Sequence, residues 1–223
     1  QMGYYMALRE FFHKAVIIGK VFKREWIRWD KIPALKEMEA IVYYFDPSYK
    51  ETSDFKAISV WGKKGSKFYL IKRFVRQCSI TAAVKWLYDE AAELLAKGLQ
   101  ADFWMEEVFL QDQFFEDFDQ EGEQRGFTLN IMGDKRKKGD KYARIVALTP
   151  YYERGMVIYN QAEKKSPDMQ IGEQQVLGFE KGSGVNDDAP DADEGAIYKL
   201  NQLGRIKNSK PVIEMRDYGL NDW

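Results

Sequence analysis

The sequence predicts an α/β protein with one mixed central sheet, in which three antiparallel strands are followed by parallel strands and helices flank the sheet. Two observations favour this class. Apolar residues make up 45% of the 223 residues and charged residues 31%, a balance typical of a globular domain and not of a disordered chain. Three hairpin-type strand patterns also come first along the chain, before a helix, a strand, a helix, a strand and further helices.

The first part of the chain predicts an arm and then a three-stranded meander. Residues 1–40 mix aromatic and charged side chains without a sustained period, which is typical of an arm or linker. Residues 41–46 predict a strand that stops at Pro47, because proline cannot donate a ladder hydrogen bond. Residues 55–61 and 67–74 predict two further strands, and the glycine-rich segment 62–66 between them predicts a hairpin connection.

The remaining elements alternate between helices and strands. Apolar residues at helical spacing over 79–97 predict a helix, with Ser79 or Thr81 as its cap and Gly98 as its end. The later expectations are a strand over 102–106, helices over 111–118, 141–152, 169–179 and about 191–203, and short strands over 128–132 and 156–159, the last at a sheet edge. We therefore expect a folded domain over 41–203 and a loose tail over 204–223.

Several function classes are excluded by residue types alone. The chain has one cysteine, Cys78, and one histidine, His13. These counts exclude disulfide frameworks, thiolate-clustered zinc sites and histidine-rich metal sites. The chain has no phosphate-loop, HExxH, nucleophile-elbow or dinucleotide-binding motif, so we expect no nucleotide cofactor in this domain. It also has neither a basic leader with an apolar core nor a long apolar run, and we expect a soluble intracellular protein with no membrane partner.

Carboxylates at predicted strand and helix ends are the strongest chemical signal. Asp46 lies at the tip of the first strand, Glu106 lies near the end of the fourth, and three aspartates precede or begin the last helix: Asp187, Asp188 and Asp191. Ionised carboxylates that meet in one place repel one another and favour hard divalent cations, so we expect Mg²⁺ or Mn²⁺. Two such ions support cleavage of phosphodiesters.

A purely structural interpretation of the same acids is open at this stage. Asp46 precedes Pro-Ser and suits a turn. Glu106 suits a solvated strand end, and the aspartates near 188 suit a loop and a helix cap that interacts with the helix dipole.

Basic residues gather locally although the formal net charge is −1. Residues 134–144 hold six basic residues against two acidic ones. The run Lys135, Arg136, Lys137 and Lys138 predicts contacts to the backbone of duplex DNA, which position the duplex without reading its sequence. Lys63 and Lys64 at the predicted hairpin tip suggest a second backbone contact. Solvated loops are the alternative for both groups.

Five segments, in order over about residues 41–200, together resemble the C-terminal nuclease domain of tailed-phage terminase large subunits. They are residues 44–58 with YFDPSY and SDFKAI, residues 105–112 with MEEVFLQD, residues 140–145 with DKYARI, residues 152–155 with YERG, and residues 186–192 with NDDAPDA. The resemblance implies an RNase H-like fold, in which the first two acids lie on neighbouring strands and the third enters from the last helix.

The resemblance also implies roles for individual acids. Asp46 and Glu106 match the first two metal-binding and catalytic positions, and Asp188 is the expected third. Further metal contacts are expected from three more aspartates: Asp54, Asp187 and Asp191. Asn186 stands where the family usually has histidine, which is a departure from the family pattern.

The same resemblance implies a basic neighbourhood and a set of partners. Lys141 and Arg144 match basic positions beside the acids, where they would face a scissile phosphate or, in the alternative, solvent. A terminase cuts concatemeric viral double-stranded DNA in the cytoplasm of the bacterial host. Its expected partners are the portal protein, the small terminase subunit and the packaging ATPase domain of the parent chain. Another RNase H-like nuclease, such as a resolvase or hybrid nuclease, and a non-cutting DNA- or portal-binding module are the rival interpretations.

Overall fold

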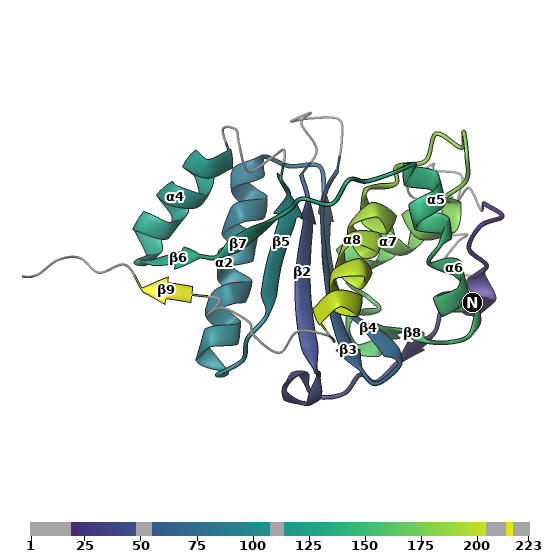
Figure 1. Ribbon diagram of the computed structural model, residues 1–223, viewed down its shortest axis with the longest axis horizontal. Helices are drawn as coiled ribbons and strands as arrows, with labels where there is room; N and C mark the ends of the chain where they lie inside the picture. The colour runs from purple at the N-terminus through teal and green to yellow at the C-terminus, as the bar shows by residue number, and fades with distance from the viewer. Residues whose placement is uncertain (1–18, 48–54, 108–113, 204–212, 216–223) are drawn as a thin grey trace, which may run out of the picture.

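A seven-stranded mixed sheet forms the centre of the residues that the structure, a computed structural model, describes: 19–47, 55–107, 114–203 and 213–215 (Figure 1). The strand order is β1-β8-β4-β3-β2-β5-β7. These strands are β1 (Trp29–Asp30), β2 (Ala40–Asp46), β3 (Lys56–Lys64), β4 (Lys67–Arg76), β5 (Asp102–Glu106), β7 (Ile131–Asp134) and β8 (Val157–Asn160).

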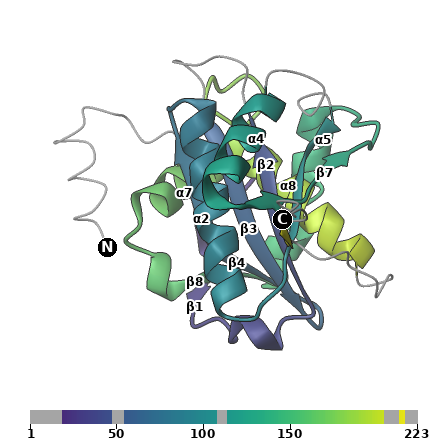
Figure 2. The same cartoon turned by 90° about the vertical axis from the view of Figure 1, so that its left-hand side faces the viewer.

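Helices cover both faces of the sheet. The α-helices are α2 (Ile80–Ala96), α4 (Phe114–Arg125), α5 (Lys141–Val146), α6 (Thr149–Glu153), α7 (Pro167–Gly178) and α8 (Asp188–Leu203). Short 3₁₀ turns are η1 (Arg24–Trp26), η2 (Leu35–Glu37) and η3 (Gln161–Glu163). Figure 2 shows α2 and α4 in front of one face, whereas α7 and α8 lie on the other in Figure 1. No helix in the described segments is both long and apolar enough to span a membrane.

The strand directions confirm the predicted fold class. β2, β3 and β4 are antiparallel neighbours, whereas β5 joins β2 in parallel, β7 joins β5 in parallel and β8 joins β4 in parallel. The hairpin between β3 and β4 turns on Gly65 and Ser66 alone, and Gly65 has a φ of 60°. Gly62, which the sequence analysis places in that turn, is instead a strand residue against Met38.

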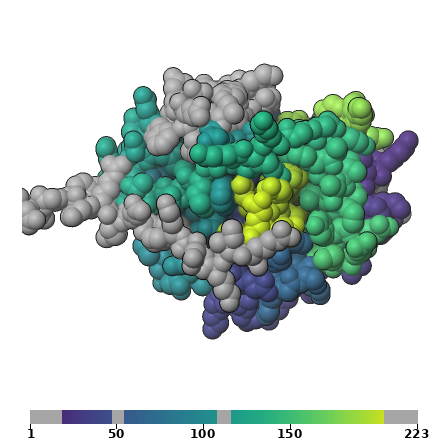
Figure 3. All heavy atoms as spheres, viewed as in Figure 1, coloured from purple at the N-terminus to yellow at the C-terminus, as the bar shows by residue number. Residues whose placement is uncertain are grey.

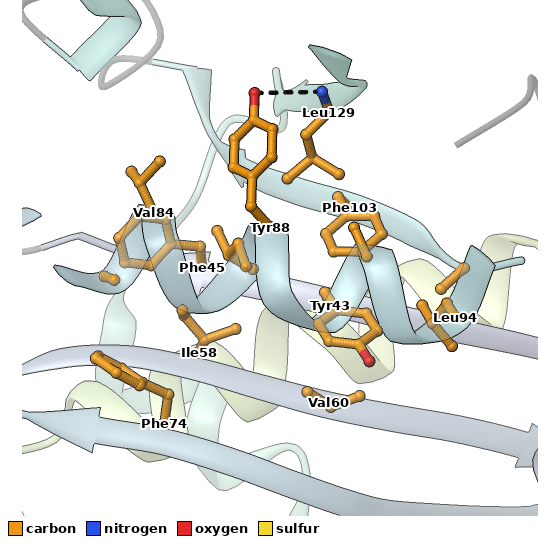
Figure 4. Close-up of a cluster of buried hydrophobic side chains, with 14 of the residues drawn as sticks. Tyr43, Phe45, Ile58, Val60, Phe74, Val84, Tyr88, Leu94, Phe103 and Leu129 are labelled. Atoms are coloured by element: carbon orange, nitrogen blue, oxygen red, sulfur yellow. Dashed lines mark hydrogen bonds between the residues drawn. The ribbon is translucent and has the colours of Figure 1, made fainter. Parts of the chain in front are cut away.

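Alternate residues of β2 supply two separate cores, because successive strand residues point to opposite faces. Tyr43 and Phe45 pack with α2, as Figure 4 shows. Val42 and Tyr44 pack with α7 and α8 on the other face. Burial on both faces is typical of a strand between two helical layers. Asp46 then follows as the first carboxylate after a run of buried apolar and aromatic residues.

Helix α2 begins and ends as its sequence predicts. The Ser79 hydroxyl accepts a hydrogen bond of 3.3 Å from the amide of Ala82 at its start. At its end, Gly98 has a φ of 63°, and the amides of Gly98 and Leu99 donate to the carbonyls of Leu95 and Leu94. These two bonds form a Schellman motif, which requires a left-handed residue where glycine is favoured.

Three predicted elements differ in the structure. The helix expected over 141–152 is broken into α5 and α6, and Pro150 occupies the first turn of α6, where its missing amide hydrogen costs no helix bond. The strand expected over 128–132 is divided into β6 (Phe127–Leu129) and β7, which belong to different sheets. The strand expected at the sheet edge, β8, lies inside it, because β1 pairs with its outer side.

Segments expected to lie outside the domain contribute to it. Within the predicted arm, β1 pairs with β8, and Phe22 is 1% exposed with its ring against Tyr152. Within the predicted loose tail, β9 (Ile213–Met215) pairs antiparallel with β6. The start of the helix expected over 111–118 lies outside the described residues, where α4 continues from residue 114 to 125.

Candidate functional site

Three acidic residues end three neighbouring strands. Asp46 is the last residue of β2, Glu106 of β5 and Asp134 of β7. These strands run parallel, so their carboxyl ends meet at one edge of the sheet, and Glu106 stands in register with Asp134. The structure thus places Asp46 and Glu106 at adjacent strand tips, as the sequence pattern indicates.

The carboxylate of Asp134 links neighbouring elements of the site through hydrogen bonds. It accepts hydrogen bonds from the Tyr44 hydroxyl at 2.8 Å, the Lys199 ammonium at 2.7 Å and the Arg136 amide at 3.2 Å. Burial alone would raise the pKa of Asp134, but the bonds from Lys199 and Tyr44 hold it below its usual value. Its oxygens are therefore occupied by donors from β2, α8 and its own loop.

Helix α8 brings a further acid to the same edge. Asp191 lies in the first turn of α8 and is 5% exposed. Its carboxylate is 3.0 Å from Nη1 of Arg144 and 3.3 Å from Nζ of Lys141, and both of these residues come from α5. The ammonium of Lys141 also lies 2.7 Å from Oδ1 of Asp187. Lys141 and Arg144 thus both pair with acids, although the side chain of Lys141 is 39% exposed and that of Arg144 only 14%.

Asp188 occupies a more peripheral position than Asp191. It is the first residue of α8 and half-buried, and its Oδ2 lies 3.4 Å from Nδ2 of Asn186. Burial raises the pKa of Asp188, while Lys141 opposes that effect. Asn186 therefore contacts one of the candidate acids. Asp54, another candidate acid, lies outside the described residues.

The surroundings of Asp46 disfavour the ionised form of its carboxylate. Its carboxylate forms no hydrogen bond or ion pair with any residue in the described part of the chain, whereas its backbone pairs with Ala57 of β3. Burial raises the pKa of Asp46 well above its usual range, and the nearby charges of Asp191 and Glu106 raise it further. Lys141 and Lys138 oppose this effect. Burial would also raise the pKa of Asp191, but these two lysines and Arg144 keep it below its usual value. The two acids are thus close enough to compete for one proton.

The metal-free Asp46→Asn variant is expected to be more stable than the wild type, by a margin that grows with pH. The folded wild type retains a proton on Asp46 that the unfolded chain releases at about pH 4. The free energy of unfolding of the wild type therefore falls as pH rises from there through the raised pKa, whereas asparagine does not titrate. We expect a margin of at least about 1–2 kcal/mol near pH 8, since each unit by which the pKa is raised contributes about 1.4 kcal/mol, and urea unfolding in a chelator measures it.

A matched measurement with Mn²⁺ controls for a general effect of the substitution. Excess Mn²⁺ should reverse the order, because an ion that binds only the folded protein stabilises the wild type. A stability difference that stays constant across pH would contradict the raised pKa of Asp46.

The basic loop after β7 contains two kinds of side chain. Lys135, whose side chain is 80% exposed, and the exposed Lys137 face solvent, although Lys135 lies 3.2 Å from Glu107. Arg136 instead makes two bonds to Glu194, at 2.6 and 2.8 Å, and stacks 3.9 Å from the centre of the Tyr198 ring. The ammonium of the fourth residue in the run, Lys138, contacts Glu106. The predicted DNA contacts therefore do not form one uniform solvated loop.

Lys63 and Lys64 lie at the far end of the sheet from the acids. Lys63 pairs with Ala40 at the start of β2, whereas Asp46 is at its end. Seven residues of strand span about 20 Å. Lys64 forms an exposed ion pair with Glu37 at 2.7 Å, and the structure does not bring either lysine to the candidate site.

Glu194 is a part of the site that the sequence analysis does not single out. It contacts Arg136 and Arg144 together, and its side chain is only 8% exposed. Its spacing of three residues from Asp191 places both carboxylates on one face of α8. Helical spacing from Asp188 through Asp191 to Glu194 is the signal that would have found it.

The chemistry of the donor set fits a hard divalent cation. Asp46, Glu106 and Asp191 offer carboxylate oxygens, which Mg²⁺ and Mn²⁺ prefer. In the described residues, no three acidic, histidine or cysteine side chains are grouped closely enough to hold a metal ion. Ammonium groups stand against the acids instead, with Lys138 on Glu106 and Lys141 on Asp191.

The mixed sheet, the acids at adjacent strand tips and the acid on a helix packed against the sheet define an RNase H-like protein. A family model described as the terminase RNaseH-like domain matches residues 43–200. The chain belongs to that family. A comparison with curated proteins finds no match.

Solved structures of viral terminases share the fold. The Mn-soaked nuclease domain of the human cytomegalovirus terminase aligns with a TM-score of 0.56 and 13% identity, over 90% of this chain and all of that domain. The nuclease domain of the bacteriophage SPP1 large terminase, with bound Mn, gives 0.50 and 13% over 82% of this chain and 98% of that one. The large terminase of a thermophilic bacteriophage gives 0.54 and 15% over 84% of this chain. This chain spans 45% of that thermophilic phage protein.

Proposed function

We propose that this domain is a divalent-metal-dependent DNA endonuclease of a phage packaging terminase, which hydrolyses phosphodiester bonds of concatemeric duplex DNA. The observation that carries the proposal is the approach of Asp46, Glu106 and Asp191 from two strands and one helix, with the pKa of Asp46 raised by burial and by the charges of the other two acids. Membership of the terminase RNaseH-like family supports the same activity.

The proposed metal ligands are Asp46, Glu106 and Asp191. Asp187 and Asp188 stand at the outer side of this set, and Asp54 is a further proposed contact. Two Mg²⁺ or Mn²⁺ ions supply an activated water and stabilise the leaving oxygen in this type of hydrolysis. The chain's own contribution is to hold carboxylates together in a half-buried place where repulsion favours cation binding.

The basic residues are proposed to receive the DNA backbone. Lys135 and Lys137 are exposed and suit phosphate contacts, which carry affinity and not sequence recognition. Lys141 and Arg144 lie directly on Asp191, where they suit a scissile phosphate next to the metal ligands. Arg136 anchors the loop through Glu194 and stays out of the proposed contact.

The parent protein is proposed to be a large terminase that acts in the cytoplasm of a bacterial host. Its ATPase domain, the portal protein and the small terminase subunit are the proposed partners, together with double-stranded DNA. The length of the thermophilic phage large terminase, of which this chain spans 45%, supports a parent longer than this chain.

A nicking assay tests the proposal. The 223-residue chain should convert supercoiled plasmid to nicked and linear forms with Mn²⁺ or Mg²⁺ and should lose this activity in a chelator. Linear duplex DNA should be cut at least as well as four-way junctions or RNA–DNA hybrids. A strong preference for junctions or hybrids would favour another RNase H-like nuclease. Salt-dependent DNA binding without any metal-dependent nicking would favour a non-cutting binding module.

A further inference from the structure

One lysine of the basic loop turns inward onto the acids. The loop that joins β7 to α5 crosses the carboxyl ends of β5 and β2 in Figure 1, and in Figure 3 this part of the chain borders the yellow atoms of α8. The ammonium of Lys138 contacts Oε1 of Glu106, and the side chain is 16% exposed. It also lies 5.4 Å from the centre of the Tyr44 ring, which the Asp134 bond holds in place.

The charge of Lys138 acts on the whole acid set. Besides the contact with Glu106, it lowers the pKa of Asp46 and of Asp191 against the effect of burial. Lys141 acts on Asp46 and contacts Asp191, but its ammonium is bound between Asp191 and Asp187 on the α8 side. Lys138 is therefore the cation that contacts Glu106, at the tip of β5.

The loop is anchored on both sides of Lys138. Arg136 fixes the loop before Lys138 through Glu194 and the Tyr198 ring. Asp140 fixes it afterwards, because its carboxylate accepts a hydrogen bond of 3.1 Å from the Ala143 amide at the start of α5. Between these anchors, Lys138 has a flexible four-carbon stem and a single mobile charge.

The geometry points to Lys138 as an internal cation that occupies Glu106 while the site lacks metal and leaves when a divalent ion binds there. An ammonium and a divalent ion repel each other and compete for the same carboxylate oxygens. Once displaced, Lys138 joins Lys135 and Lys137 as a phosphate contact, so metal binding and DNA binding support each other. This inference rests on the proposed metal site.

Mn²⁺ titration of the 223-residue chain, followed by the electron paramagnetic resonance signal of free Mn²⁺, tests the displacement. Lys138→Gln should bind Mn²⁺ about tenfold more tightly than Lys137→Gln, because a partly buried charge-assisted contact no longer has to be broken. Lys137→Gln is the matched control, since it removes the same charge from the same loop at an exposed position. Circular dichroism spectra of both variants establish that they fold.

DNA binding gives a second, independent readout. In a chelator, Lys137→Gln should weaken duplex binding and Lys138→Gln should leave it close to wild type. With Ca²⁺ present and the DNA verified as intact, both substitutions should weaken binding to a similar extent. Equal Mn²⁺ affinities of the two variants, with Mn²⁺ still bound by the wild type, would overturn the role of Lys138 alone. A wild type that binds no Mn²⁺ would overturn the metal site as well.

Discussion

Asp191→Asn is expected to lower the rate of metal-dependent plasmid nicking by at least about a thousandfold, equivalent to about 4 kcal/mol of transition-state stabilisation. Asp191 is the α8 acid whose charge acts on Asp46, and asparagine keeps its shape but removes the charge. The variant should still fold, because no buried cation is left alone. Arg144 retains Glu194, and Lys141 retains Asp187.

Asp188→Asn is the matched control for this prediction. It removes the same charge from the same helix, three residues earlier, and should lower the nicking rate by less than about tenfold. Initial rates with Mn²⁺ measure both variants. The opposite order would make Asp188 the third ligand, which is the residue that the resemblance to terminases implies. Unchanged nicking by both variants would place the reaction elsewhere.

Local patterns in the sequence predict the framework that positions the acids. The apolar run before Asp46, the glycine-containing hairpin and the capped α2 each carry their own signal, and each forms, although the hairpin turn is shorter than expected. The tips of two buried strands then place Asp46 and Glu106 side by side, because β2 and β5 are parallel neighbours. The strand part of the candidate site follows from these local signals.

The helix part of the site depends on contacts that local patterns do not carry. The sequence analysis expects the last helix from about residue 191, whereas α8 begins at Asp188. Three additional residues place Asp191 within the first turn, where it is nearly inaccessible to solvent. Arg136 has the same sequence context as its lysine neighbours, but a glutamate 58 residues away decides its role. A run of charged residues in the sequence therefore does not predict which of its side chains stay exposed.

The placement of Asp191 depends in turn on how α8 is attached to the sheet. The carboxylate of Asp193 is fully buried between α8 and the sheet, where it accepts hydrogen bonds from three side chains of β3 and β4. They are the Ser59 hydroxyl at 2.7 Å, the Trp61 indole at 2.9 Å and the guanidinium of Arg73. Gly172 lets α7 pack directly on Arg73, since a Cβ there would lie 2.6 Å from its Cδ. Arg73 thus contacts both helices of this face, through an ion pair with Asp193 of α8 and through packing against Gly172 of α7.

Arg73→Met is expected to lower the free energy of unfolding by about 3–5 kcal/mol, because it leaves Asp193 buried without its cation. The side chains of Arg73 and Asp193 are 0% and 1% exposed, so water cannot replace the lost partner. Urea unfolding near neutral pH measures the loss. Arg76→Met, on the same strand, is the matched control, because Arg76 pairs with Asp168 but its side chain is 53% exposed. It should cost about 1 kcal/mol.

The double variant Arg73→Met with Asp193→Leu tests separately how the ion pair affects stability and how it affects the position of Asp191. Removing both charges avoids an unpaired buried ion, so the double variant should be more stable than the sum of the two single losses implies, by at least about 1 kcal/mol. Additive losses would mean that the two charges do not stabilise each other. If the double variant folds with apolar packing in their place, α8 keeps its position and Mn²⁺ affinity should stay near wild type. A folded double variant with weakened Mn²⁺ binding would mean that the ion pair itself sets the position of Asp191.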